Sequence, residues 1–465
     1  IRKLIGDAKA EEYIMKKYIF LNGEYAIPNV EFKLKYTSEP NSLNENWWKN
    51  ILAYVQTIKA THDVTICQQV EWNLRNIIQL DIQNDSLNGY LYKIERILFK
   101  IYRFRENSVL LDMLKECKTF FKRDKEKWIR CLVDEATLYM DIEEFKVSKE
   151  KFEQALESCK ENSVRKEVQI LVEDEYSRVL EKTGHYYEAV NKLYVVEQYY
   201  QEVKNEKKLN NVKNRIGLNL SFIGDIERAT EYLESLLFGN FNKKIDRNNI
   251  LSCEVANNLS LCYMEAGFYK KALRLQNSLY QLYLRTQDTP VNYATDILQN
   301  KGNIYLYEHK YYEAFKCFEQ ALNDETNPYS KELILENYLY AKGFYETNFE
   351  ESITFFENQI RQTEMNYETC KMLAEMYFAN QNYSKCAKLC KRVLNQIVYR
   401  EERFIYICLD IMYMSSLKKT NKLTLRQRYS CYTRIARYKQ FIKRHVGCRS
   451  PYYRKIEECK LVLKG

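Results

Sequence analysis

The sequence predicts an all-α protein built from stacked helical hairpins, and three observations lead to this fold class. Its 465 residues include only 12 glycines and 5 prolines, whereas average usage would make these two residues about 12% of a chain. One short motif recurs seven times, at intervals of 34 to 43 residues. The apolar positions around each copy lie three, four or seven residues apart, which is the spacing of one face of an α-helix.

Composition also excludes several classes of protein. Hydrophobic residues make up 46% and charged residues 29% of the chain, which is typical of a folded protein and not of a disordered one. No run approaches 18 apolar residues, so no membrane-spanning helix is predicted. The 14 cysteines include no Cys-x-x-Cys pair, and the first 30 residues lack the pattern of a secretory signal. These two features indicate a cytoplasmic protein.

The N-terminal segment, residues 1–42, is expected to contain a short β-hairpin over residues 18–36. The Asn22-Gly23 pair stands there between two apolar runs, and such a pair is the strongest short-range hairpin signal. Two strands alone are only marginally stable, and the chain begins with Ile1 rather than Met. We therefore expect this segment to be the edge of an upstream domain in a longer protein.

Residues 43–127 are predicted to form a helical cap or degenerate repeats. An apolar stripe at helical spacing consists of Trp47, Trp48, Ile51, Leu52, Val55 and Ile58. Residues 91–102 and 109–121 are expected to make a further hairpin, which would cover the open end of the array that follows.

Residues 128–400 contain the repeated motif. We call the last residue of each copy its anchor. The seven anchors are Ser148, Ala189, Ala229, Ala272, Ala314, Ser352 and Cys386. A fixed period of this kind is the signature of a repeat architecture, in which each unit is one supersecondary element.

Each repeat is predicted to be a helix-turn-helix hairpin. Twelve residues before the anchor stands a small residue in six of the copies, and nine residues before it stands a large apolar or aromatic one. Five residues before the anchor, the apolar pattern changes phase, often at Gly or His, so the first helix ends there. The small residue would let two helices approach closely, and a hairpin of this kind buries its apolar stripe only against its neighbours.

This series of residues resembles the tetratricopeptide repeat family. The resemblance covers about residues 128–400, although only the last interval has the family's usual period of 34 residues. It implies a right-handed superhelical solenoid whose first helices line a concave groove. We expect residues 401–465 to form a basic helical cap on this solenoid. The resemblance also implies that residues 15, 14 and 11 before each anchor face that groove.

Those groove positions are rich in asparagine. The predicted binding residues for a protein or peptide segment are Arg178, Asn214, Arg215, Asn257, Asn258, Gln299, Asn300, Asn303 and Asn337. A carboxamide offers both donors and acceptors, so it can pair with a peptide backbone without selecting its side chains. The alternative is that an asparagine-rich chain places this residue everywhere, including here.

The positive charge is concentrated in the last part of the chain. Residues 415–465 contain 15 Lys and Arg against 2 Glu, while the rest of the chain has 57 basic and 61 acidic residues. The candidate contacts for nucleic acid or an acidic partner are Arg426, Arg428, Arg434, Arg437, Lys439, Lys443 and Arg444. Interleaved tyrosines would suit a phosphate-tracking surface. The favoured interpretation is a basic cap whose aromatic residues pack on the last repeat.

Catalytic chemistry is not predicted. The sequence has no phosphate-binding Gly-x-x-x-x-Gly-Lys-Ser/Thr loop, no Gly-x-Gly-x-x-Gly, no His-Glu-x-x-His and no Gly-x-Ser-x-Gly. Its four histidines are His62, His185, His309 and His445. We expect neither a metal site nor a cofactor, and no enzymatic activity.

The expected function is therefore recognition. In one setting the chain is the sensor or scaffold part of a larger bacterial signalling or defence protein. In a second it is similar to the cytoplasmic peptide-pheromone receptors of low-GC bacteria, which also use asparagines carried by repeats. A third alternative is a nucleic-acid-associated protein that uses the basic C-terminal helices.

Overall fold

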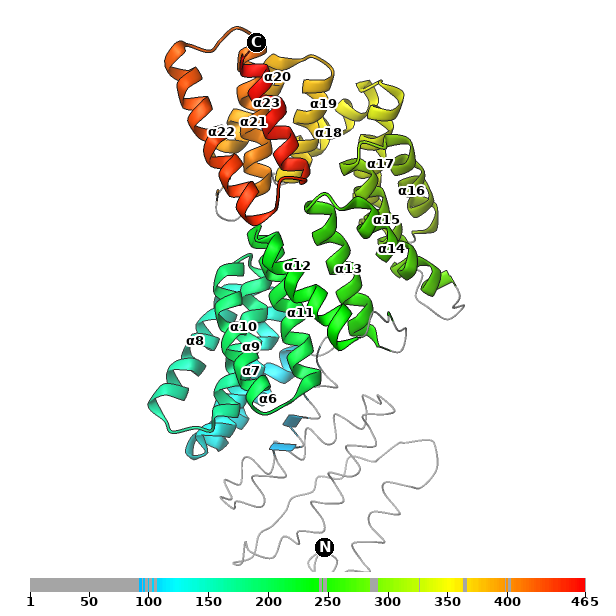
Figure 1. The fold of residues 1–465 in the computed structure, drawn as a ribbon. Coiled ribbons are helices and arrows are strands. Elements are labelled where there is room, and N and C mark those ends of the chain that lie inside the picture. Colours follow the sequence, from blue (N-terminus) through cyan, green and yellow to red (C-terminus); the bar gives the residue numbers. More distant parts are fainter. Residues whose placement is uncertain are drawn as a thin grey trace, which may run out of the picture. The chain divides into compact units, whose positions relative to one another are not determined.

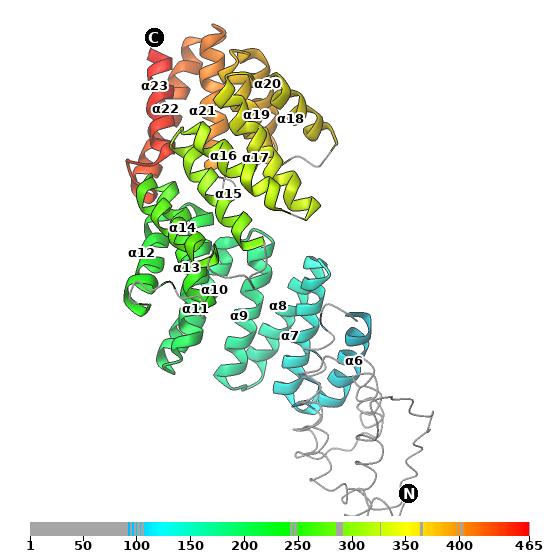
Figure 2. The same ribbon diagram turned by 90° about the vertical axis from the view of Figure 1, so that its right-hand side faces the viewer.

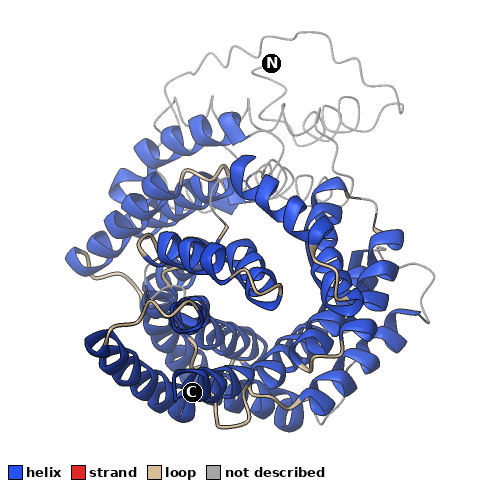
Figure 3. Cartoon of the chain, turned by 90° about the horizontal axis from the view of Figure 1, so that it is seen from above, coloured by secondary structure: helices blue, strands red, loops and turns tan. Residues whose placement is uncertain are grey.

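The computed structural model describes residues 92, 93, 95, 96, 99, 103, 107–241, 245, 249–284, 292–325, 327–362, 366–397, 399 and 403–464. Within these ranges every regular element is a helix, and no strand occurs (Figure 3). The predicted β-hairpin over residues 18–36 and the apolar stripe from Trp47 to Ile58 lie outside the described residues. The all-α fold class is confirmed for the part of the chain that can be described.

Within the described residues, seven helical hairpins follow one another in sequence (Figure 1). They are α7 (Lys125–Asp141) with α8 (Phe145–Glu161), α9 (Lys166–Lys182) with α10 (Tyr186–Glu202), α11 (Glu206–Ile223) with α12 (Ile226–Glu234), α13 (Ile250–Glu265) with α14 (Tyr269–Leu284), α15 (Asn292–Tyr307) with α16 (Tyr311–Asp324), α17 (Pro328–Glu346) with α18 (Glu350–Gln362), and α19 (Tyr367–Ala379) with α20 (Tyr383–Leu394). Each hairpin carries one of the seven anchors in its second helix.

Further helices flank the seven hairpins. On the N-terminal side lie α6 (Asn107–Phe120) and the 3₁₀-helix η2 (Phe121–Arg123), and the π-helix η3 (Ser235–Asn240) extends α12. The C-terminal helices are α21 (Arg403–Lys419), α22 (Leu425–His445) and α23 (Pro451–Lys464). None of the described helices combines the length and the apolar character that a membrane span requires.

The chain divides into two compact units, Ile1–Glu175 and Tyr176–Gly465, and the division falls within α9. In the described part of the first unit, α6 packs on α7 and α7 packs on α8. In the second unit the helices from α10 to α21 pack consecutively, and α13 also contacts the first helices of both neighbouring repeats, α11 and α15. The domain limits inferred from the sequence, at residues 42, 127 and 400, remain predictions.

The anchors confirm the repeat register. All seven anchor residues are at most 2% exposed. The small residue twelve positions earlier is small for a steric reason: a Cβ added to Gly302 would lie 2.6 Å from the ring of Phe318, and one added to Gly217 would lie 2.8 Å from Leu233. In these two hairpins the helices therefore approach each other too closely for a larger residue at the crossing point.

The turn of every hairpin has the same backbone conformation. The residue five positions before each anchor has positive φ in all seven repeats: Glu143, Gly184, Gly224, Gly267, His309, Thr347 and Gln381. Only three of these are glycines, the residue that adopts this conformation without steric cost. The phase change read from the sequence thus marks a left-handed residue that ends each first helix.

The basic C-terminal segment is folded against the rest of the second unit. Helix α23 packs on both α21 and α22, and the three helices lie side by side in both ribbon views (Figures 1 and 2). The residues that α22 and α23 bury are Cys431, Ile435, Tyr438, Ile442, Pro451, Tyr452, Ile456, Cys459 and Leu463. This packing is what a capping role requires.

Candidate functional site

The candidate site is the face of the first helices defined by positions 15, 14 and 11 before each anchor, which we call the first-helix face. On α11, α13 and α15 the structure brings four of the predicted asparagines together. The Nδ2 of Asn258 donates to the Oδ1 of Asn214 at 3.1 Å, and the Nδ2 of Asn300 donates to the Oδ1 of Asn257 at 2.9 Å. Carboxamides 15 and 14 positions before the anchors thus connect three successive repeats. We call Asn214, Asn257, Asn258 and Asn300 the carboxamide ladder.

A fifth carboxamide joins this ladder from the second helix α14. Gln276 is fully buried, and its Nε2 donates to the Oδ1 of Asn257 at 2.9 Å and to the Oγ of Ser260. Sequence reasoning missed this residue. The available signal was its position four residues after the anchor, where Phe152 and Phe318 fill the core of other repeats.

The ladder leaves polar groups unused. A carboxamide has two N–H donors and an oxygen that can accept two hydrogen bonds. The Oδ1 of Asn257 already accepts two, but no described residue accepts from its Nδ2. The Oδ1 atoms of Asn258 and Asn300 likewise receive no donor within the described part. These half-buried side chains are therefore held in fixed orientations with donors and acceptors still available.

The other predicted residues on α15 and α17 do not form hydrogen bonds with the ladder. Gln299 and Asn303 on α15 are half-buried, and no side-chain hydrogen bond joins them to a described residue. Asn337 on α17 donates to the carbonyl of Leu333 in its own helix at 3.3 Å. The ladder therefore runs from α11 to α15 and does not include the predicted asparagine of α17.

The two predicted arginines lie at the start of this face. Arg178 is exposed on α9. The guanidinium of Arg215 donates to both carboxylate oxygens of Glu181, at 3.0 and 3.2 Å, and to the Oγ of Ser177 at 2.6 Å. Because this guanidinium already ties α11 to α9, its main visible contribution is to join the two repeats.

On α19 the same positions carry charged residues. Lys371 and Glu375 stand 15 and 11 positions before the last anchor. Glu375 accepts hydrogen bonds from Lys455 of α23 and, at 2.6 Å, from the Tyr340 hydroxyl of α17. Burial alone would raise the pKa of Glu375, but Lys455, Lys371 and these hydrogen bonds together lower it to about 2. In the last repeat, the first-helix face therefore holds the chain's own C-terminal helix.

The basic residues of α22 fall into three groups. Arg434 pairs with the fully buried Asp410, which also accepts from the Tyr438 hydroxyl at 2.7 Å, and Lys439 pairs with Glu457 at 2.6 Å. Arg428 is half-buried. The exposed basic residues are Arg426, Arg437, Lys443 and Arg444. The structure thus uses part of the predicted basic surface to attach the cap.

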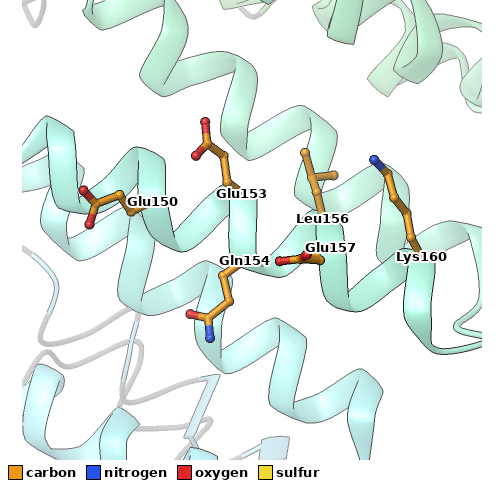
Figure 4. Close-up of a pocket in the computed structure, with 6 residues that line it drawn as sticks. All are labelled: Glu150, Glu153, Gln154, Leu156, Glu157 and Lys160. Atoms are coloured by element: carbon orange, nitrogen blue, oxygen red, sulfur yellow. The ribbon is translucent and has the colours of Figure 1, made fainter.

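A shallow hollow in the first unit is a weaker candidate for a binding site. It is lined by residues of a single helix, α8: Glu150, Glu153, Gln154, Leu156, Glu157 and Lys160 (Figure 4). Its three carboxylates lie at exposed positions on successive turns of this helix. This is the arrangement of a solvated helix face. Among the residues that the structure describes, no cluster of His, Cys, Asp or Glu could hold a metal ion.

Comparison with known proteins adds information at the level of the fold. No protein-family model matches the chain, and no curated protein matches its sequence. Among solved structures, the chain is similar to the apo form of the quorum sensor NprR from B. thuringiensis, with a TM-score of 0.54 and 14% identity over 76% of this chain and 99% of that one.

Two further solved structures resemble it less closely. The apo form of RapI has a TM-score of 0.49 at 14% identity and covers 81% of this chain and 98% of its own. NprR in complex with its cognate peptide NprX has a TM-score of 0.45 at 14% identity and covers 74% and 99%. The repeat register, the buried anchors and the likeness to apo NprR together show that this chain has a tetratricopeptide-like helical-repeat fold.

Proposed function

We propose that the chain is a recognition module that binds a protein or peptide segment along the first-helix face of α11, α13 and α15. The observation that carries this proposal is the carboxamide ladder. Asn257, Asn258 and Asn300 are fixed by bonds between repeats, yet each keeps a donor or acceptor free. An extended segment has backbone N–H and C=O groups that need such partners when they are buried.

The ladder favours contact with backbone over contact with one particular side chain. A carboxamide supplies a donor and an acceptor together, and an extended chain presents both at regular intervals. Each pairing contributes about 0.5–1.5 kcal/mol net, so affinity should depend on several carboxamides acting together. Arg178 and Asn337 would lie at the two ends of this site.

Two biological settings fit this proposal. The chain can be the sensor or scaffold part of a larger bacterial signalling or defence protein. It can also be a cytoplasmic peptide-pheromone-sensing regulator, and the likeness in fold to apo NprR, which is described as a quorum sensor, supports this second setting. Neither setting requires the chain itself to catalyse a reaction.

Nucleic-acid binding is a weaker proposal for the same chain. Arg434 and Lys439 are occupied by ion pairs with Asp410 and Glu457. That leaves four exposed basic residues on α22, spread over its length, to contact phosphates. Such binding would weaken steeply with added salt, because each neutralised phosphate releases condensed counterions.

The test is binding to a library of short unstructured peptides of random sequence, measured with the full chain. The most informative variant combines Gln299→Ala and Asn303→Ala, because these two side chains have no described partner and their loss should not alter folding. Retention of peptides should fall several-fold with the melting temperature unchanged. The matched control is Asn211→Ala with Asn323→Ala, two exposed asparagines of α11 and α16 outside the face.

Two results would overturn the proposal. One is a wild-type chain that retains no peptide from the library. The other is retention that is equal in the Gln299/Asn303 variant and in wild type but is lost when the exposed residues of α22 are changed.

A further inference from the structure

The C-terminal helices make contacts that are unusual for a repeat array. In such arrays each repeat normally contacts only its neighbours. Here Arg403, at the start of α21, donates to the hydroxyl of Tyr187, which is 216 residues away. His445, at the end of α22, lies 3.5 Å from Asp225 in the turn between α11 and α12. The second unit is therefore closed on itself by residues far apart in the sequence.

The turns of two repeats are shaped to receive these helices. A Cβ added to Gly224 would lie 3.0 Å from the ring of Phe404 in α21. One added to Gly267 would lie 2.1 Å from the backbone oxygen of Arg449, in the connection between α22 and α23. Both contacts bring the C-terminal segment to the ends of the first helices α11 and α13.

Tyr452, in the first turn of α23, is the centre of the closure. The residue is 5% exposed, and its ring stacks on that of Phe404, with centroids 4.5 Å apart and planes 5° apart. Its hydroxyl lies 3.2 Å from that of Tyr307, the last residue of α15, and the Tyr307 hydroxyl donates to the Oε1 of Glu265 at 3.4 Å. One tyrosine thus links α23 to α15 and, through it, to α13.

One turn further along α23, Lys455 holds the helix to α19. It donates to Glu375, which Tyr340 of α17 also supports. Further on, the thiol of Cys459 lies 3.6 Å from the backbone oxygen of Ile411 in α21. Helix α23 is therefore attached along its length to α15, α19 and α21, and through Tyr307 of α15 to α13.

Glu265 is the least well supported polar side chain among these contacts. It is the last residue of α13, where the negative end of the helix dipole disfavours a carboxylate. Its Oε1 receives one long hydrogen bond, and its Oε2 is buried without a partner in the structure. A buried ionised carboxylate needs more support than this, so the protonated form suits the closed arrangement.

The groups facing Glu265 come from four neighbouring helices. They are Tyr307 of α15, Tyr452 of α23, Lys371 and Glu368 of α19, and Tyr269 of α14. Burial raises the pKa of Glu265 to about 7. The nearby Tyr452 hydroxyl, the charge of Lys371 and the hydrogen bond from Tyr307 oppose this increase, while Glu368 adds to it.

We propose that α23 is a latch that holds the α13 and α15 repeats against the C-terminal helices and that loosens when Glu265 ionises. Opening admits water to the carboxylate and separates Tyr452 from Tyr307. The latch needs no bound peptide, so it goes beyond the proposed recognition function and can be tested without it.

The test is amide hydrogen exchange of α23 in the full chain at pH 6 and pH 8, expressed as protection factors so that the intrinsic pH dependence is removed. With a pKa of about 7 in the closed state and about 4.5 when open, proton linkage predicts that protection falls about tenfold between these pH values. Glu265→Gln should abolish this fall. The control Glu227→Gln, at an exposed position of α12, should behave as wild type.

A second variant keeps the test decisive if Glu265→Gln does not fold. Lys455→Met removes the ion pair with Glu375 but leaves Glu265 in place. It should lower the protection of α23 at both pH values while the fall between them persists. Equal protection of wild-type α23 at pH 6 and pH 8, or an unchanged fall in Glu265→Gln, would overturn the proposal.

Discussion

The two halves of the second unit use the same first-helix face in different ways. On α11, α13 and α15 this face carries neutral carboxamides that bond to one another and keep groups free. On α19 it carries Lys371 and Glu375, and Glu375 holds Lys455 of α23. The comparison shows that a repeat scaffold only sets where a side chain points. The residue type decides whether the position remains available to a partner or closes the array.

The closing contacts should dominate stability, and two glycines test this directly. Gly184 and Gly267 have φ values of 77° and 81°, so Ala at either position costs about 1–2 kcal/mol in backbone strain. A Cβ at Gly184 meets nothing within 4 Å, whereas at Gly267 it meets the backbone of Arg449. Gly267→Ala should therefore cost about 1–3 kcal/mol more than Gly184→Ala, as measured by urea denaturation. Equal losses would show that the contact at Gly267 does not constrain the closed state.

Removing the charge that faces Glu375 should have the next largest effect. Lys455→Met leaves a largely buried carboxylate with Tyr340 and Lys371 as its remaining support. Fully buried pairs lose about 3–5 kcal/mol when one partner is removed. Because the side chain of Lys455 is 32% exposed, solvent screening should reduce the loss to about 2 kcal/mol. The exposed pair of Lys316 and Glu319 on α16 is the control, and Lys316→Met should change the unfolding free energy by less than about 0.5 kcal/mol.

The carboxamide ladder should contribute about as much as the ion pair of Lys455 and Glu375. Asn258→Ala removes the donor to Asn214, which is only 6% exposed, and an unsatisfied buried acceptor costs about 1–3 kcal/mol. Asn337→Ala should cost less than about 0.5 kcal/mol, because its bond lies on the surface of its own helix. Thermal unfolding of the two variants compares them. A loss at Asn337 as large as that at Asn258 would contradict the assignment of the ladder to α11–α15.

The last expected effect is a change in the shape of the pH profile rather than in stability at a single pH. The pKa of Glu265 is raised in the folded state, so the stability that it contributes is present below its unfolded pKa of about 4.5 and is lost as the pH rises to about 7. Glu375 has a lowered pKa, so its contribution is present above about 4.5 and is lost as the pH falls toward 2. Glu265→Gln should flatten the profile between pH 4.5 and 7, and Glu375→Gln should flatten it below pH 4.5. Melting temperatures across this range check both.

The repeat architecture could be predicted because its causes are local. The anchors, the small residue at each helix crossing and the change of phase are all set by contacts within a hairpin or with the next one. Gly302 shows this well, since its neighbour Phe318 lies in the same hairpin. Helix periodicity alone is sufficient to locate such contacts in the sequence.

The candidate site was only partly predictable. Equivalent offsets placed Asn214, Asn257, Asn258 and Asn300 on one face, and the structure brings them together. The offsets could not show that these carboxamides bond to one another, because a hydrogen bond depends on the rotation of one repeat against the next. The same limit explains why Gln276, which approaches from a second helix, was missed.

What the sequence alone determined is the hairpin, its period and the residues that occupy each offset, because these follow from the helix geometry within about 40 residues. Only the tertiary structure decided that α23 returns to the first-helix face of α19 and that Tyr452 reaches Tyr307 and, through it, Glu265. The small rotation between neighbouring repeats accumulates along the array. No local sequence pattern specifies the total rotation. That accumulated rotation brings residues about 145 to 220 positions apart into contact.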